Sequence, residues 1–202
     1  MATVVKCIKE RISQLPVGEP FSSKELVGFG TRAAVDQNLS RLVKRGEVMR
    51  VTRGVYVRPK QSKYVGAVTP EPLKVAHAKV LTAKESVQVH GAEAARQFGF
   101  TTQVPTTPLF YTSGSNRRFR VGNLRVKLKH VSARKLTFAG TPAGNALSAL
   151  WYVGKENISD GLIEKIKEKL TASEFEKLKA AKSIMPAWMA DAFYRYEQQA
   201  RR

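Results

Sequence analysis

The stretch from Thr31 to Pro59 reads TRAAVDQNLSRLVKRGEVMRVTRGVYVRP, and it decides the predicted fold of this chain. Apolar residues recur at three- and four-residue spacing from Ala34 to Val43, which predicts one amphipathic helix. Thr31 is a good N-cap, and Gly46 supplies a left-handed stop after the last turn. Two short alternating segments follow, joined by Thr52-Arg53-Gly54, and they predict a tight hairpin. We therefore expect a helix followed directly by two antiparallel strands.

The polar face of this predicted helix carries long side chains with hydrogen-bond donors, which reading of base edges in a DNA major groove requires. A basic hairpin directly after such a helix is the plan of a winged helix. The predicted base-reading residues are Arg32, Gln37, Ser40 and Arg41. The predicted phosphate-contacting residues are Thr31, Lys44, Arg50, Arg53 and Arg58. The alternative interpretation is that these charges form a solvated face on an ordinary small α+β domain.

The preceding residues complete the expected domain. A helix is predicted over Thr3 to Gln14, then a short strand at Phe21, then a brief helix over Lys24 to Val27 capped by Ser22 or Ser23. The predicted fold class is α+β. We expect a winged helix-turn-helix domain over residues 1–64 and a basic α/β domain with a helical tail over residues 65–202.

Composition restricts the kind of partner. The net charge of +19 on 202 residues implies a polyanion, which is DNA, RNA or, as a weaker alternative, an anionic membrane. No apolar run approaches the length of a membrane-spanning helix. The N-terminal residues predict a charged helix rather than a signal peptide, and the single cysteine, Cys7, fits a reducing compartment. We therefore expect a cytoplasmic protein with no membrane partner.

Two segments, PVGEPFSSKEL and GFGTRAAVDQNLSRLVKRGEVMRVTRGVYVRP, resemble the N-terminal winged helix of AbiEi-type antitoxins, the repressors of type IV toxin–antitoxin systems. The matching features are Arg32-Ala33-Ala34, the pair Leu39 and Leu42, Gly46, and Arg53-Gly54-Val55-Tyr56. The resemblance implies a repressor that binds repeats upstream of its own operon. It also implies a functional link to a nucleotidyltransferase-like toxin without a stable complex between the two proteins. A winged helix often binds repeats as a dimer, and the charge of the two domains could also let a monomer bind one half-site, so we expect a monomer or a homodimer.

The middle of the chain predicts a second basic surface. Strands are expected over Arg118 to Val121 and Leu124 to Val131, joined by Gly122-Asn123. Period-two alternation places Arg125, Lys127 and Lys129 on one face of the second strand. The surface comprises Arg117, Arg118, Arg120, Arg125, Lys127 and Lys129. It is either a solubilising face or a second phosphate-contacting surface.

The positive charge is distributed unevenly along the chain. Residues 1–68 carry 13 Lys and Arg against 5 acids, residues 69–135 carry 12 against 3, and residues 136–202 carry 10 against 8. The polyanion surface is therefore expected in the first two thirds. Residues 60–69 are predicted to be a linker, and the last third predicts four helices.

No catalytic, metal-binding or cofactor-binding constellation is predicted. His77 has no second ligand at metal spacing, and His90 near Glu93 lacks a nucleophile and a third orienting group. We therefore expect a non-enzymatic protein with no cofactor and no metal. Two alternatives remain beside the DNA-binding repressor: an RNA-binding or toxin-binding module that acts through the second domain, and a nuclease with a diffuse site.

Overall fold

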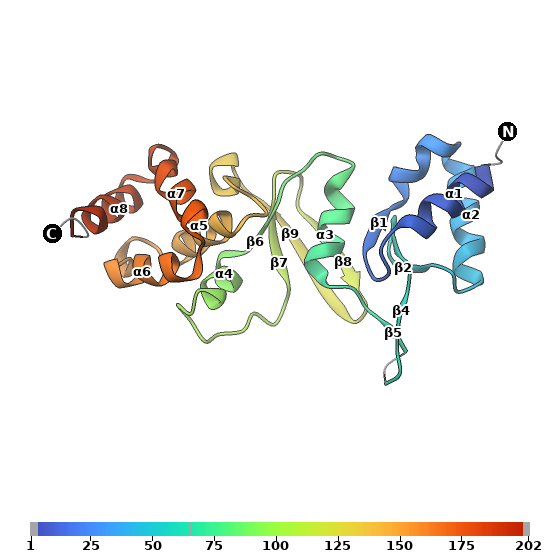
Figure 1. Ribbon diagram of the computed structural model, residues 1–202, viewed down its shortest axis with the longest axis horizontal. Coiled ribbons are helices and arrows are strands. Elements are labelled where there is room, and N and C mark those ends of the chain that lie inside the picture. The colour runs from blue at the N-terminus through green and yellow to red at the C-terminus, as the bar shows by residue number, and fades with distance from the viewer. Residues whose placement is uncertain (1–3, 65, 200–202) are drawn as a thin grey trace. The chain divides into compact units, whose positions relative to one another are not determined.

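The computed structural model describes residues 4–64 and 66–199, which form a mixed α/β fold of helices and small sheets (Figure 1). Thr3, the predicted first residue of the first helix, and residue 65, where the second domain was predicted to begin, lie outside the described residues. The chain divides into two compact units. The first unit is Met1–Glu85 with Arg117–Lys127, and the second is Ser86–Asn116 with Leu128–Arg202.

The first unit begins with six elements in the predicted order: α1 (Val4–Gln14), β1 (Pro20–Ser22), η1 (Ser23–Phe29), α2 (Arg32–Lys44), β2 (Met49–Thr52) and β3 (Val55–Val57). The predicted helix caps are confirmed. The Thr31 hydroxyl accepts a hydrogen bond from the Ala34 N–H, and Ser22 forms a capping box with Glu25 at the start of η1. Gly46 has a φ of 74°, the left-handed conformation that ends α2.

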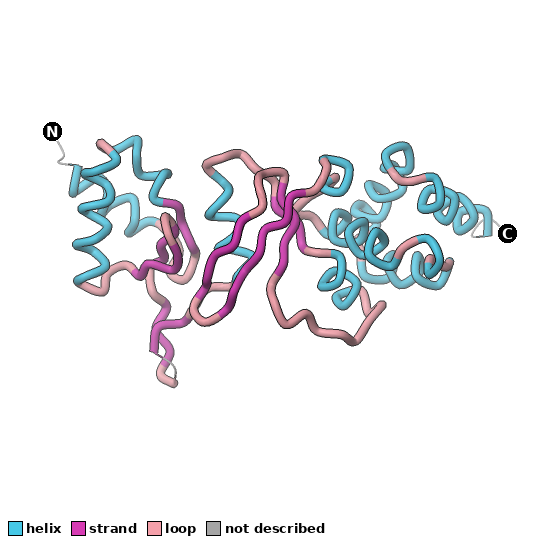
Figure 2. Tube along the Cα trace, turned by 180° about the vertical axis from the view of Figure 1, so that it is seen from behind, coloured by secondary structure: helices cyan, strands magenta, loops and turns pink. Residues whose placement is uncertain are grey.

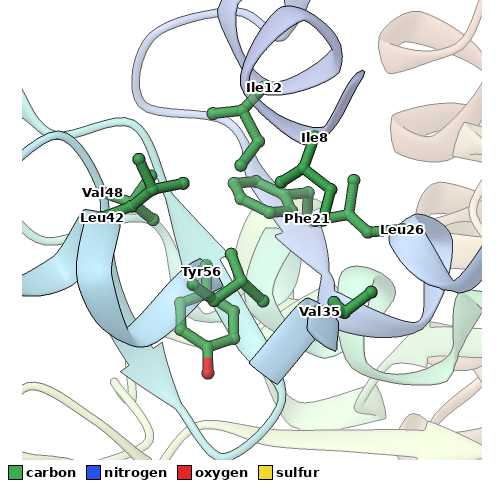
Figure 3. Packing of buried hydrophobic residues seen from close by; sticks show 9 residues of the cluster. Ile8, Ile12, Phe21, Leu26, Val35, Leu42, Val48 and Tyr56 are labelled. Carbon is green, nitrogen blue, oxygen red and sulfur yellow. The ribbon is translucent and has the colours of Figure 1, made fainter. Parts of the chain in front are cut away.

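The three strands pair in the order β1-β3-β2, and their inner face closes one core with α1, η1 and α2 (Figure 3). Ile8, Leu39 and Tyr56 belong to this core. The predicted alternation along the second hairpin strand is wrong, because all three residues of β3 are buried. β3 is the central strand, and a further helix, α3 (Pro72–Leu81), lies along β1 and β3. Both faces of β3 are therefore covered.

The predicted linker contains regular structure. Strands β4 (Lys60–Ser62) and β5 (Gly66–Val68) pair antiparallel as a two-stranded ribbon, with Lys60 opposite Val68. Most of these side chains are exposed, so the sequence has the polar, glycine-containing composition of a linker. The ribbon is formed by backbone pairing, which leaves no signal in the side-chain pattern.

The predicted domain boundary after residue 64 lies inside the first unit. α3 belongs to that unit because it covers the β1-β3-β2 sheet, and β8 (Arg117–Val121) lies beside β2. β9 (Leu124–His130) follows β8 across the predicted Gly122-Asn123 turn and continues into the second unit at Leu128. Whether residues 1–64 function as a separate domain stays a prediction.

The second unit combines short strands with the helical tail, which Figure 2 shows as strands in magenta and helices in cyan. β6 (Val87–Val89) and β7 (Leu109–Thr112) pair antiparallel, in a sheet of order β6-β7-β9-β8. The helical elements are α4 (Gly91–Gln97), η2 (Ala133–Leu136), α5 (Pro142–Val153), η3 (Lys155–Asn157), α6 (Asp160–Lys169), α7 (Ala172–Ala180), η4 (Ala181–Ile184) and α8 (Ala187–Gln199). The four predicted tail helices are confirmed as α5 to α8.

Buried polar groups connect the strands of the second unit to its helices. The buried amide of Gln88 on β6 donates to Asn145 Oδ1 at 2.6 Å, and its oxygen accepts from the Gly140 N–H at 2.8 Å. Ser148 Oγ donates to the Val89 carbonyl oxygen at 2.8 Å. Because unpaired buried polar groups are costly, these bonds fix α5 against β6.

Across the described residues, no helix has the length and apolar character that crossing a membrane requires.

Candidate nucleic-acid interface

The exposed face of α2 is the first candidate surface. Successive helical residues are rotated by about 100°, and the buried residues Val35, Leu39 and Leu42 define the inward side. The residues that point directly away from that side are Ala33, Gln37, Ser40 and Lys44, and all four are exposed. Among the described residues, the side chains of Gln37, Ser40 and Lys44 make no hydrogen bond or ion pair. They form a stripe of donors that a ligand can reach.

The two predicted arginine readers lie on the flanks of this stripe. Arg32 Nε donates to Asp36 Oδ2 at 2.9 Å, so its charge is balanced within the helix. Arg41 lies toward α1, where it lines a shallow depression with Val5 and Lys9. Gln37 and Ser40 are therefore central to the face, and Arg41 is peripheral. The hydroxyl of Thr31, a predicted phosphate contact, is already bonded to the Ala34 N–H as the helix cap.

The arginines of the hairpin differ from one another in their surroundings. Arg50 is exposed and pairs across the strands with Tyr56, so its side chain leaves the sheet on the side where α1 and α2 lie. Arg53 is exposed in the β2–β3 turn. Arg58 instead donates two hydrogen bonds of 2.7 Å to the carbonyl oxygens of Ser13 and Leu15. Of the predicted phosphate contacts, Arg58 already has protein partners.

The β8–β9 hairpin carries the second basic surface. Phe119, Val121 and Val126 are buried, whereas the alternating Arg118, Arg120, Arg125 and Lys127 are exposed. The two-residue turn is expected to set residue 120 opposite 125 and residue 118 opposite 127. None of these four cations forms an ion pair within the described residues. Because like charges on facing strands repel, this face favours an anionic partner.

The other two residues of the predicted surface are placed differently. Arg117 is partly buried on the opposite face of β8 and forms an ion pair with Glu85. Lys129 is exposed on the part of β9 that belongs to the second unit. The surface built by the first unit is therefore the four-cation face of the hairpin.

Sequence reasoning missed Lys79. It lies on the inward face of α3, between the buried residues Val75 and Ala76 in angular position, and its Nζ donates to the Arg53 carbonyl oxygen at 3.2 Å. Partial burial lowers the pKa of Lys79, and the nearby charges of Arg117, Arg53 and Lys24 lower it further. A lysine on the apolar face of a helix was the signal in the sequence that could have identified it.

The histidines have structural surroundings. His90 Nδ1 accepts a hydrogen bond from the Ala92 N–H and caps α4, and its ring lies 4.8 Å from that of Tyr111. Glu93 is bound by Arg96 at 2.6 and 2.8 Å, so it is not paired with His90. Partial desolvation lowers the pKa of His77, whose side chain is exposed on α3. Within residues 4–64 and 66–199, no group of three His, Cys, Asp or Glu residues could hold a metal ion.

Comparison with known proteins gives a family and no curated relative. A search of the curated proteins found no match. A family model described as a family of unknown function, DUF6088, matches residues 7–178, a span that includes α2, the β2–β3 hairpin, α3 and the β8–β9 hairpin. Since this match covers most of the chain, the protein belongs to the DUF6088 family.

Proposed function

We propose that this protein binds double-stranded DNA in a sequence-specific manner, with the elements from α1 to β3 as a winged helix-turn-helix domain and α2 as the recognition helix. The observation that carries the proposal is the unpartnered outward stripe of α2, which includes Gln37, Ser40 and Lys44. The order of the elements and the β1-β3-β2 sheet also support it. The net charge of +19 supports a polyanionic partner.

The geometry suggests a division of roles. Gln37 and Ser40 contact base edges, and Ala33 lets the helix approach them closely. Lys44, Arg50 and Arg53 contact phosphates, which fixes the register without reading sequence. Arg41 contacts DNA from the flank of the stripe that faces α1. Arg32 contributes least, because Asp36 balances its charge.

The exposed cations of the β8–β9 hairpin add sequence-independent affinity. Arg118, Arg120, Arg125 and Lys127 present four positive charges without a neighbouring acid on the same strands. Each phosphate contact that such a cation makes releases counterions, so its contribution falls as salt rises. In this proposal α2 selects the sequence and the hairpin supplies part of the binding free energy.

The biological role we propose is that of an autoregulating repressor, the antitoxin of a type IV toxin–antitoxin operon. The resemblance of about the first 60 residues to AbiEi-type antitoxins supports this role. The partners are then operator repeats and, through function rather than a stable complex, a nucleotidyltransferase-like toxin. In this proposal the protein is cytoplasmic, acts as a monomer or homodimer, and is not an enzyme.

Binding to the DNA upstream of the gene tests the proposal. Fluorescence anisotropy would compare that DNA with a scrambled duplex of equal length, for the wild type and for Gln37→Ala, Arg53→Ala and Lys155→Ala. We expect Gln37→Ala to lose about 1–3 kcal/mol on the upstream DNA only, and Arg53→Ala to weaken both duplexes and reduce the salt slope by about one unit. Lys155→Ala removes one exposed charge from the nearly neutral tail and is the matched control.

The result that would contradict the proposal is equal binding of the two duplexes by the wild type, with no effect of Gln37→Ala. A Gln37→Ala variant and an Arg53→Ala variant that behave alike on both duplexes would refute the division of roles.

The exposed face of the β8–β9 hairpin favours a second candidate, an RNA-binding or toxin-binding module. Here the four cations, rather than α2, carry the function. A full-length variant with Arg118, Arg120, Arg125 and Lys127 all changed to Ser distinguishes the two. If the wild type does not select the upstream DNA and this variant loses RNA or toxin binding, the second candidate is supported. If this variant still selects the upstream DNA and the wild type binds neither RNA nor the toxin, the first candidate is supported.

A further inference from the structure

The ammonium group of Lys79 is the centre of a cluster of cations in the first unit. Lys79 is partly buried on the inward face of α3, where its Nζ lies 5.4 Å from the centre of the Phe119 ring and bonds to the Arg53 carbonyl oxygen. Three further cations act on it: Lys24 of η1, Arg53 of the β2–β3 turn and Arg117 of β8. Four elements that are distant in sequence therefore bring positive charge to one place.

The cluster has little internal compensation. Lys24 and Arg53 are exposed and form no ion pair within the described part of the chain. Arg117 is paired with Glu85, whose carboxylate carries one negative charge against the four positive charges of the cluster. Like charges close together raise the free energy of the folded protein, and partial burial of Lys79 adds to this because the charged form loses solvation. Both effects lower the pKa of Lys79.

Two of the elements that supply these cations also carry buried donors without acceptors. Arg117 Nε and Ser23 Oγ are buried and have no hydrogen-bond partner among the described residues. Ser23 is fully buried, and its N–H donates to the Gly54 carbonyl oxygen at 2.9 Å, next to the residue that Lys79 binds. Native proteins rarely leave such donors unpaired, so each is expected to have an oxygen acceptor from a water molecule or a ligand, and the Arg117 Nε lies within the cation cluster.

We propose that the cluster formed by Lys24, Arg53, Lys79 and Arg117 binds a phosphoryl group. Its negative charge offsets the repulsion among the cations, and its tetrahedral oxygens can accept from ammonium and guanidinium donors that four different elements supply. Lys79 is the central ligand, with Lys24 and Arg53 on the exposed side and Arg117 from β8. This inference goes beyond reading of DNA by α2, since none of the four residues lies on that helix.

The phosphoryl group has two possible sources with the same chemistry. One is a phosphate of the DNA backbone, held beside the β2–β3 turn. The other is a free phosphate monoester, bound whether or not DNA is present. Both require Lys79, and only the first makes DNA affinity depend on it.

Thermal unfolding of the full-length protein in rising inorganic phosphate tests the site, with sodium chloride used to keep the ionic strength constant. We expect phosphate at about ten times its dissociation constant to raise the Tm of the wild type by about 3 °C or more. Lys79→Met should show no such rise. Lys74→Met is the matched control, because Lys74 lies on the same helix but is exposed and paired with Glu19 at 2.6 Å. It should respond as the wild type does.

Lys79→Met removes a partly buried charge that others repel, so it is expected to fold with an unchanged or higher Tm in phosphate-free buffer. Arg53→Gln provides a second variant from a different element, and it should weaken phosphate binding at least threefold in calorimetric titration. Equal phosphate responses of the wild type, Lys79→Met and Arg53→Gln would overturn the proposal.

A DNA arm separates the two sources. If the ligand is a backbone phosphate, Lys79→Met weakens binding to every duplex and reduces the salt slope by about one unit, whereas Lys74→Met does not. If the ligand is a free phosphate, Lys79→Met leaves DNA affinity unchanged and the wild type binds phosphate equally with duplex present. Neither result depends on sequence selection by Gln37, so failure of the phosphate site is distinguishable from failure of α2 as the reader.

Discussion

Arg58 holds the end of the first helix: its Nη1 donates to the Leu15 carbonyl oxygen at 2.7 Å, and to that of Ser13 at the same distance. These bonds join the residue after β3 to the C-terminal end of α1, where carbonyl oxygens lack partners within the helix. Arg58→Ala should therefore lower the free energy of unfolding by about 1–3 kcal/mol, measured by urea denaturation.

Lys60→Ala is the control for Arg58, since Lys60 is nearby, exposed and without an ion pair among the described residues. It should change stability by less than about 0.5 kcal/mol. An Arg58→Ala variant with unchanged stability and a reduced salt slope of DNA binding would instead assign Arg58 to a phosphate.

Gly91, the first residue of α4, lies directly against α5. A Cβ added there would lie 2.6 Å from Tyr152 Cβ and 2.7 Å from the Ser148 carbonyl oxygen. Gly91→Ala should therefore destabilise the protein by about 1–3 kcal/mol, because the backbone of α5 must shift. Gly28→Ala is the matched control, as a Cβ there meets nothing within 4 Å. It should be neutral or stabilising in the same thermal or urea unfolding experiment, and equal losses at both positions would contradict this account.

His90 predicts a pH dependence of stability. Its pKa in the folded protein is lowered, first by burial and then by the charges of Lys129 and Lys135. The unfolded chain, with an ordinary value of about 6.5, then binds the proton more readily, so stability falls as pH drops below about 6.5. Protonation of Nδ1 also removes the acceptor that caps α4.

His90→Asn keeps a capping acceptor and removes the titration. Its stability should fall less steeply than that of the wild type between about pH 6.5 and pH 5, measured by urea denaturation at each pH. Parallel pH profiles for the two proteins would show that His77 or other groups cause the dependence.

Asp36 places a negative charge on the flank of the α2 face, where Arg32 balances it. Asp36→Asn releases Arg32 and should raise affinity for every duplex, with a salt slope steeper by about one unit. Glu168→Gln removes an exposed acid from α6 in the second unit and should leave affinity unchanged. Unchanged binding by Asp36→Asn, measured by anisotropy at several salt concentrations, would place the DNA away from α2.

Local signals in the sequence predicted the order of the elements from α1 to β3, but not the strands β4 and β5. The cap at Thr31, the stop at Gly46 and the Gly122-Asn123 turn each depend on a few neighbouring residues, and all three were predicted. The burial of β3 was not, because it depends on α3 packing against the sheet from far along the chain.

The candidate surfaces were predicted as sets of residues but not in their geometry. Periodicity separated Gln37 and Ser40 from the core, yet the i,i+4 bond between Arg32 and Asp36 makes Arg32 a weaker reader than its charge suggested. The cluster at Lys79 could not be assembled from the sequence, because its four cations lie more than 20 residues apart along the chain and meet only through tertiary packing. The same holds for Arg58, whose partners lie 43 and 45 residues away.

In vitro selection from a random duplex library by the full-length protein tests reading by α2 most directly. We expect the wild type to enrich a defined motif and Gln37→Ala to enrich a motif relaxed at one position. Lys155→Ala should enrich the wild-type motif. If the wild type enriches no motif, α2 is not the reader. The same conclusion follows if Gln37→Ala and Ser40→Ala, tested separately, each enrich the wild-type motif unchanged.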